Sequence, residues 1–283
     1  MTKPFSLRHA DTVVDIMASA AAQEIMPRFS GAMPNRTTQK TTAFDIVTEA
    51  DEAAELRISA QLRAEFPGAA LIGEEAVFRD ASLLAQIATA DLAFIIDPID
   101  GTRNFASGVP LFGVMVAATV RGEVVFGAIH DPVCGDTAVA VRGEGAWRQG
   151  GGRPRADLRV ADPVPLDQIQ AVAGTNFLPE PLRSTVAGNL SRISLNFWLR
   201  CAAHEYRLAA AGHCHVLVYN KLMPWDHAAG WLLHREAGGY SAHFDGSPYL
   251  PTHTSGGLIC ATDAQSWALV RSALLDAPAA PRS

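Results

Sequence analysis

Residues 92–96 form an uninterrupted apolar run that ends at two acids three positions apart, Asp97 and Asp100. A run without polar alternation is typical of a strand that is covered on both faces, which requires other layers above and below it. Pro98 fixes the backbone directly after Asp97, and Gly101 permits a tight turn. The chain is therefore expected to be layered, with a buried strand that delivers carboxylates to one edge of a sheet.

Hydrophobic periodicity predicts helices and strands in both halves of the chain. In the first half we expect helices over 7–26 and from 48 to about 65, and strands over 71–72, 92–96, 113–120, 124–130 and 137–141. In the second half we expect strands over 171–174, 216–219 and 258–261, and helices over 182–189, 200–211, 225–237 and 264–275. A shift to Gly, Arg and Pro between 150 and 159 divides the chain into halves 1–150 and 151–283. This alternation predicts an α/β or α+β layered sandwich.

Composition excludes several classes of function. The 283 residues are 48% hydrophobic, yet no run of about 20 apolar residues predicts a membrane span. Four cysteines without a Cys-x-x-Cys pair, and an N-terminus without a signal-peptide layout, indicate a reduced cytoplasmic protein. The net charge of −6 disfavours nucleic-acid binding, and the basic, glycine-rich residues 142–159 are predicted to form solvated loops. The expected partner is therefore a small molecule, with no nucleic acid and no membrane.

Carboxylates stand at the ends or starts of the predicted apolar elements. They are Asp45, Asp51, Glu74, Glu75, Asp97, Asp100 and Asp226. Acids gathered at one edge repel each other unless a cation lies between them, and Mg²⁺ prefers carboxylate and water oxygens. Two such ions can activate a water and stabilise the leaving oxygen of a phosphate ester. The pattern predicts metal-assisted phosphate chemistry.

Each of these signals also has an ordinary structural interpretation. The Asp97–Pro98 pair is a common turn signal, and Thr48 with Asp51 is a helix capping box. Glu74 and Glu75 are typical of a solvated loop, and Asp226 of a first helical turn. Their occurrence together and in this order favours the site.

The motif 97–102, Asp-Pro-Ile-Asp-Gly-Thr, resembles the signature of the inositol monophosphatase family. Gly-Glu-Glu at 73–75 precedes it and Trp-Asp-His-Ala-Ala-Gly at 225–230 follows it, and segments 45–51 and 236–239 extend the resemblance over about residues 7–275. The resemblance implies an αβαβα sandwich, two or three Mg²⁺ ions for which Mn²⁺ can substitute, lithium sensitivity and a homodimer. The implied activity is hydrolysis of a small phosphate monoester such as an inositol monophosphate.

The resemblance also implies roles for individual residues. The first metal would be held by Glu74, Asp97, Thr102 and the carbonyl of Ile99, the second by Asp97, Asp100 and Asp226, and a third, weaker ion by Glu74 and waters. Asp51 and Thr102 would polarise the attacking water, so that Asp51, Glu74 and Thr102 are the catalytic candidates. The N–H groups of Gly101 and Thr102 would hold phosphate oxygens. Lys40 and Glu75 are accessory candidates.

The sequence departs from its relatives at the wall that contacts the substrate. Arg200 stands where relatives have a small residue, and Tyr219 where they have a glutamate. The predicted substrate-binding residues are Asp100, Gly101, Thr102, Arg200, Ala202, Tyr219 and Asp226. Arg200 and His204 either make polar contacts on one helix face, or Arg200 meets a second anionic group of the substrate. His213 and His215 lack further ligands at zinc spacing.

Three functions remain open from the sequence. The first is hydrolysis of an inositol monophosphate or a similar polyol phosphate. The second, within the same family, is hydrolysis of histidinol phosphate or of a sugar or nucleotide bisphosphate. The third is a regulatory protein in which the site is vestigial, which the intact set of acids disfavours.

Overall fold

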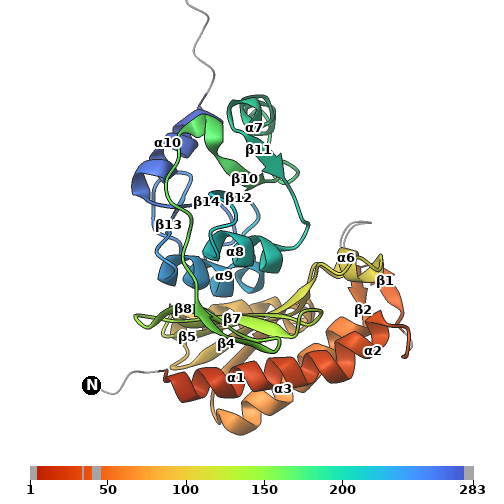
Figure 1. Cartoon of the computed structure of the whole chain (residues 1–283). Coiled ribbons are helices and arrows are strands. Elements are labelled where there is room, and N and C mark those ends of the chain that lie inside the picture. Colours follow the sequence, from red (N-terminus) through yellow and green to blue (C-terminus); the bar gives the residue numbers. More distant parts are fainter. Residues whose placement is uncertain (1–4, 34, 40–45, 277–283) are drawn as a thin grey trace, which may run out of the picture.

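The computed structural model describes residues 5–33, 35–39 and 46–276, which stack in five layers (Figure 1). Helices α1 (Leu7–Ala20) and α3 (Glu49–Glu65) cover the outer face of a seven-stranded sheet. Helices α8 (Ala202–Ala210) and α9 (Pro224–Glu236) separate this sheet from a five-stranded one. Helices α7 (Leu182–Asn189) and α10 (Ala264–Leu275) cover the far side. The predicted αβαβα sandwich is confirmed.

The seven-stranded sheet is antiparallel except for its first pair, β3 and β4. Its order is β3 (Ala70–Gly73), β4 (Ala93–Asp100), β5 (Gly113–Val120), β6 (Glu123–Asp131), β7 (Asp136–Val141), β8 (Gly145–Gly150) and β9 (Arg153–Asp157). The five-stranded sheet has the order β11 (Leu195–Phe197), β10 (Gln170–Ala173), β12 (Val216–Tyr219), β14 (Leu258–Ala261) and β13 (Tyr240–His243). In this second sheet, β11, β10 and β12 run parallel, whereas β14 is antiparallel to β12 and β13.

Short elements connect these layers. They are η1 (Ala21–Ile25), α2 (Met26–Phe29), β1 (Thr37–Gln39), β2 (Ile46–Thr48), α4 (Glu74–Arg79), η2 (Ala81–Ala85), α5 (Gln86–Thr89), α6 (Thr102–Ala106), η3 (Leu166–Gln168) and η4 (Leu190–Arg192). The helix predicted over 7–26 is α1 followed by a π-helical turn and α2. The predicted cap of α1 is confirmed, because the Ser6 hydroxyl accepts a hydrogen bond from the His9 N–H at 3.2 Å.

Strand β4 is buried on both faces, as its apolar run predicts. Phe94 and Ile96 pack toward α1 and α3, while Ala93 and Ile95 pack toward α8 and α9. The strand continues past the expected end at residue 96 as far as Asp100, with a register shift between Asp97 and Asp100. Pro98 has no N–H to donate, and such a residue is accommodated where the ladder is irregular.

Two predictions about local structure are wrong. Residues 142–159, expected to be loops, contain β8 and β9, so position 150 falls inside a hairpin of the first sheet. Glycines with positive φ build this turn, and the Arg155 guanidinium lies 4.0 Å from the centre of the Trp147 ring. The helix expected from residue 200 begins at Ala202, because Arg200 has a φ of 56° and Cys201 is the N-cap.

Candidate active site

The carboxyl end of β4 holds two acids of the central motif. Asp97 is only 2% exposed, and its Oδ1 atom has no hydrogen-bond partner within the described residues. Burial raises the pKa of Asp97 well above its usual range, and the charges of Glu74, Asp100, Asp226 and Asp51 raise it further. The structure therefore concentrates negative charge at the place where the sequence predicted a metal site.

Asp51 joins the capping of α3 to the predicted site. Its Oδ2 accepts hydrogen bonds from the Thr48 N–H at 2.8 Å and the Thr48 hydroxyl at 2.5 Å, which is the expected capping box. Its Oδ1 lies 3.2 Å from the Thr102 hydroxyl, which also lies 2.9 Å from the Ile99 carbonyl oxygen. Burial raises the pKa of Asp51 to about 7. Asp51 therefore caps α3 through one carboxylate oxygen and faces the predicted site through the other.

Glu74 begins α4 directly after β3, and a buried acid of α3 holds that helix start in place. The Glu55 carboxylate accepts hydrogen bonds from the Glu75 N–H at 2.7 Å and the Ala76 N–H at 2.9 Å. A Cβ on Gly73 would lie 2.3 Å from the Glu55 carboxyl carbon, so a larger residue here would displace this carboxylate from the start of α4. Sequence reasoning missed Glu55, although an acid four residues after Asp51, on the apolar stripe of α3, was a usable signal.

Asp100 connects the first half of the chain to α8. Its Oδ2 accepts hydrogen bonds from the Ala203 N–H at 2.6 Å and the Cys201 thiol at 3.0 Å. Burial raises the pKa of Asp100 to about 6. Gly101 has a φ of 86°, and a Cβ there would lie 2.9 Å from the Leu111 carbonyl oxygen. The turn after Asp100 is therefore specified by steric fit.

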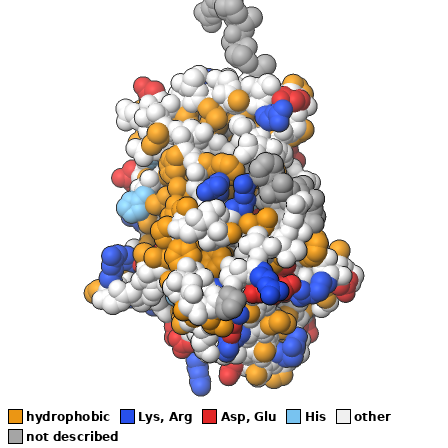
Figure 2. All heavy atoms as spheres, turned by 90° about the vertical axis from the view of Figure 1, so that its right-hand side faces the viewer, with side chains coloured by type: hydrophobic (Ala, Val, Ile, Leu, Met, Phe, Trp, Pro, Cys, Tyr) orange, Lys and Arg blue, Asp and Glu red, His pale blue; other side chains and the backbone are white. Residues whose placement is uncertain are grey.

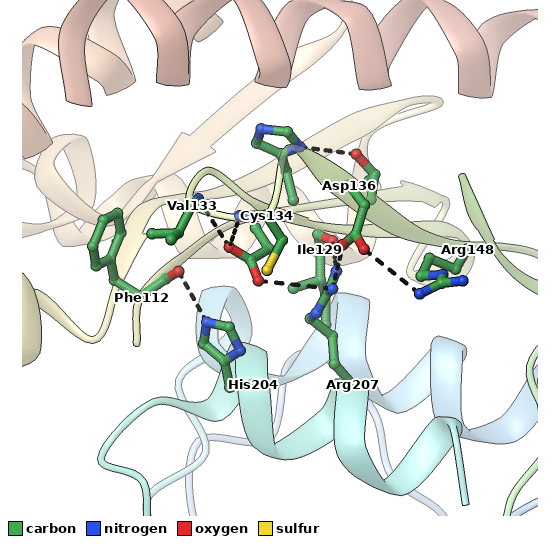
Figure 3. A network of polar contacts seen from close by, with 11 residues as sticks. Phe112, Ile129, Val133, Cys134, Asp136, Arg148, His204 and Arg207 are labelled. Atoms are coloured by element: carbon green, nitrogen blue, oxygen red, sulfur yellow. Dashed lines mark hydrogen bonds and ion pairs between the residues drawn. The ribbon is translucent and has the colours of Figure 1, made fainter. Parts of the chain in front are cut away.

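Helix α8 is docked on the first sheet by a second group of polar contacts (Figure 3). The Arg207 guanidinium donates to the Asp136 carboxylate and, at 3.1 Å, to the Ile129 carbonyl oxygen. His204 Nε2 lies 3.2 Å from the Phe112 carbonyl oxygen, and burial lowers the pKa of His204. His204 therefore contacts the residue that precedes β5, and the idea that it shares one helix face with Arg200 is wrong because Arg200 precedes the helix.

A pocket opens beside these acids, between the two halves of the chain. The predicted residues that line it are Glu74, Asp100, Gly101, Thr102, Arg200, Ala202, Tyr219 and Asp226. The neighbouring Asp51, Asp97 and Ile99 are buried. Glu75 is also buried, in the first turn of α4, while Lys40 and Asp45 lie outside the described residues.

The outer part of the pocket combines aromatic and basic side chains. Phe177 and Trp198 line it while being 63% and 46% exposed, and the exposed Arg200 and Lys221 line it as well. Figure 2 shows a face of the molecule on which hydrophobic side chains gather around Lys and Arg side chains. Large exposed aromatic groups at the mouth of a pocket are typical of a surface that a ligand covers.

The donor set fits a hard cation. As the side chains stand, no three His, Cys, Asp or Glu residues in the described ranges form a group that could hold an ion. The acids around Asp97 nevertheless raise its pKa through their charges, and its Oδ1 has no hydrogen-bond partner within those same ranges. Mg²⁺ prefers oxygen donors such as carboxylates, and a bound cation would offset the repulsion between them. We therefore expect these side chains to approach one another around a bound ion.

Comparison with known proteins identifies the class to which this fold and site belong. The chain belongs to the inositol monophosphatase family, whose sequence model matches residues 8–275. That match spans both sheets and every acid predicted from the motifs.

Individual relatives are similar over most of their length. The chain is 35% identical over 246 residues to a protein of Pseudomonas aeruginosa named Nus factor SuhB, covering 83% of this chain and 85% of the relative. It is 33% identical over 215 residues to the fructose-1,6-bisphosphatase/inositol-1-monophosphatase of Thermotoga maritima, covering 74% and 75%. A solved inositol monophosphatase structure from Thermotoga maritima superposes with a TM-score of 0.79 at 27% identity, covering 94% of this chain and 96% of that one.

Proposed function

We propose that this protein is a Mg²⁺-dependent phosphomonoesterase that hydrolyses a small phosphate ester of the inositol monophosphate type. The observation that carries the proposal is the buried Asp97 carboxylate, surrounded by other acids at the edge of a pocket. Membership of the inositol monophosphatase family supports the same activity. Within the described chain, no helix is both long and apolar enough to cross a bilayer.

The proposed metal ligands are the oxygens of Glu74, Asp97, Ile99, Asp100, Thr102 and Asp226. When bound, the ions would supply Lewis-acid stabilisation and lower the pKa of a water. The Thr102 hydroxyl donates toward Asp51 or toward the Ile99 carbonyl, which leaves its oxygen lone pairs able to accept a hydrogen bond from the attacking water. Asp51 would thereby orient this water, while the N–H groups of Gly101 and Thr102 would hold phosphate oxygens.

The proposal is tested by measuring phosphate release from polyol, sugar, histidinol and nucleotide phosphates with Mg²⁺ present. We expect Mn²⁺ to substitute in part, and Ca²⁺ and lithium to inhibit. Ca²⁺ prefers longer bonds and a higher coordination number than sites spaced for Mg²⁺. Activity that survives exhaustive chelation, or no activity on any ester, would contradict the proposal.

A regulatory role is the second candidate, because a relative at 35% identity is named a Nus factor. A retained fold without phosphate release would favour it over the enzyme, and binding to RNA would contradict the expectation that nucleic acid is no partner. The homodimer stays a prediction, to be checked by light scattering. The cytoplasmic location stays a prediction, to be checked by cell fractionation.

A further inference from the structure

The pocket contains an acid that the proposed metal site does not use. Among the described residues, four acids line the pocket, and Glu205 on α8 lies among the wall residues rather than in the group around Asp97. It is 1% exposed when the whole residue is considered. A buried carboxylate at a pocket wall costs free energy unless its oxygens are hydrogen-bonded.

The contacts of Glu205 orient it and leave acceptor capacity. Its Oε1 accepts a hydrogen bond from the Leu199 N–H at 3.1 Å, and its Oε2 accepts one from the Tyr219 hydroxyl at 3.0 Å. The Cys201 backbone N–H also stabilises the charged form. These three neutral donors occupy three of the roughly four acceptor positions of a carboxylate, which leaves one for a ligand.

A purely structural role does not require a carboxylate here. An amide oxygen would serve to accept from Leu199, and Tyr219 could then donate or accept as needed. Burial raises the pKa of Glu205 to about 7, which reports the cost of placing a charge in this position. A buried acid with a raised pKa that lines a ligand pocket is a candidate functional residue.

Resting on the proposed phosphatase function, we infer that Glu205 is a specificity-determining residue that accepts a hydrogen bond from the alcohol part of the substrate. Leu199 holds one carboxylate oxygen and Tyr219 holds the other, so the orientation of the acceptor is set before a ligand binds. The preferred ester is one whose alcohol carries free hydroxyl groups near the phosphate. Esters of plain hydrocarbons lack the donor and leave this acid without its partner.

The test compares two esters that share a six-membered ring, inositol 1-phosphate and cyclohexyl phosphate, which has no hydroxyl groups. The variant is Glu205→Gln, assayed with Mg²⁺ at pH 8, where the carboxylate of the parent is ionised. We expect the ratio of kcat/KM values, inositol over cyclohexyl, to fall by about 10- to 100-fold, mostly through KM. Glu55→Gln is the matched control, since it alters a buried acid outside the pocket lining and should change both esters by one factor.

Two outcomes overturn the inference. One is that Glu205→Gln slows both esters equally, as the control does, which assigns it a structural role. The other is that Tyr219→Phe removes the selectivity while Glu205→Gln retains it, which makes Tyr219 the residue that reads the hydroxyl. Dissociation constants for both esters, measured calorimetrically with Ca²⁺ in place of Mg²⁺, keep this test independent of turnover. Loss of the preference for the inositol ester in Glu205→Gln supports the inference even if the parent hydrolyses neither ester and the proposed function fails.

Discussion

Replacing Arg200 with glycine separates the strain of its backbone from the function of its side chain. Arg200 has a φ of 56°, a left-handed conformation that costs a residue with a Cβ about 1–2 kcal/mol. The preceding residue is held on both sides, because the Leu199 N–H donates to Glu205 at 3.1 Å and the Leu199 carbonyl accepts from Asn104 at 2.8 Å. The segment therefore has little freedom to relieve the strain by moving.

The expected change in stability follows from two opposing contributions. Arg200→Gly removes about 1–2 kcal/mol of strain, but the freedom that glycine adds to the unfolded chain costs about 0.4–1 kcal/mol. The net expectation is a gain of about 0–1.6 kcal/mol in the free energy of unfolding, with a central value of about 0.8 kcal/mol. Arg200→Ala keeps the strain, and because the side chain is exposed it should change stability by less than about 0.5 kcal/mol. Urea denaturation measures both as midpoint shifts at constant slope.

Arg121→Gly is the matched control for this comparison. Arg121 has a φ of 50° in the turn between β5 and β6, outside the pocket lining, and its ion pair with Asp91 is exposed. We expect a similar gain in stability with no change in substrate preference, because an exposed pair contributes little. Both Arg200 variants should instead alter the ranking of substrates more than activity on a minimal ester. Our account of Arg200 fails if glycine is less stabilising than alanine, or if all substrates slow by one factor.

Three further predictions concern the acids and the core. Asp97→Asn should lower turnover by at least ~10³-fold, about 4 kcal/mol of barrier, with an unchanged circular dichroism spectrum, and near-parental turnover would refute the metal-bridging role. Mg²⁺ should raise the melting temperature more at pH 8 than at pH 6. Burial raises the pKa of Asp51 to about 7 and that of Asp100 to about 6, so the ionisation of these carboxyls destabilises the metal-free fold as the pH rises from 6 to 8. At pH 6 a binding ion must first displace protons from the same groups. Buried histidines with lowered pKa values change the stability with pH in the opposite direction, so the melting temperatures with and without Mg²⁺ are compared at each pH separately. Equal increases in melting temperature on adding Mg²⁺ at pH 6 and pH 8 would contradict the prediction. Gly230→Ala should destabilise by about 1–3 kcal/mol in urea, although alanine favours helices, because the new Cβ would lie 2.1 Å from the buried Tyr206 ring, and a gain in stability would count against this packing.

The sequence predicted the strongly patterned elements well. The strands at 113–120, 216–219 and 258–261 and the helices at 182–189 and 264–275 have the expected bounds. These segments carry continuous or periodic apolar residues bounded by turn signals, so local pattern and burial agree. Strands β1, β2, β8, β9, β11 and β13 were not predicted. Residues of β9 are all exposed, two of the three residues of β11 are exposed, and only the last two residues of β13 are buried, so the pairing of these strands depends on neighbours distant in the sequence.

Site residues that belong to sequence motifs could be predicted. Site residues whose role depends on a contact with a distant part of the chain could not. Asp51 and Thr102 are 51 positions apart, yet their proximity was expected, because the family resemblance implies that both polarise one water. Glu55 and Glu205 belong to no motif, and their importance appears only when the chain brings Glu75 and Tyr219 against them. Buried acids on helices were the available signal, and a propensity argument alone treats them as exposed.

The two halves of the chain do not supply the proposed metal ligands and the substrate wall independently of each other, as Asp100 shows. Asp100 lies on β4 in the first half, but the groups that donate to its Oδ2 belong to Cys201 and Ala203 of the second half. The same segment presents Arg200 and begins the helix that carries Glu205. A change in this segment that alters the wall can therefore also reorient a proposed metal ligand. Substitutions that retain the Cys201 and Ala203 contacts should affect recognition alone, whereas those that disturb either contact should lower turnover on every ester together.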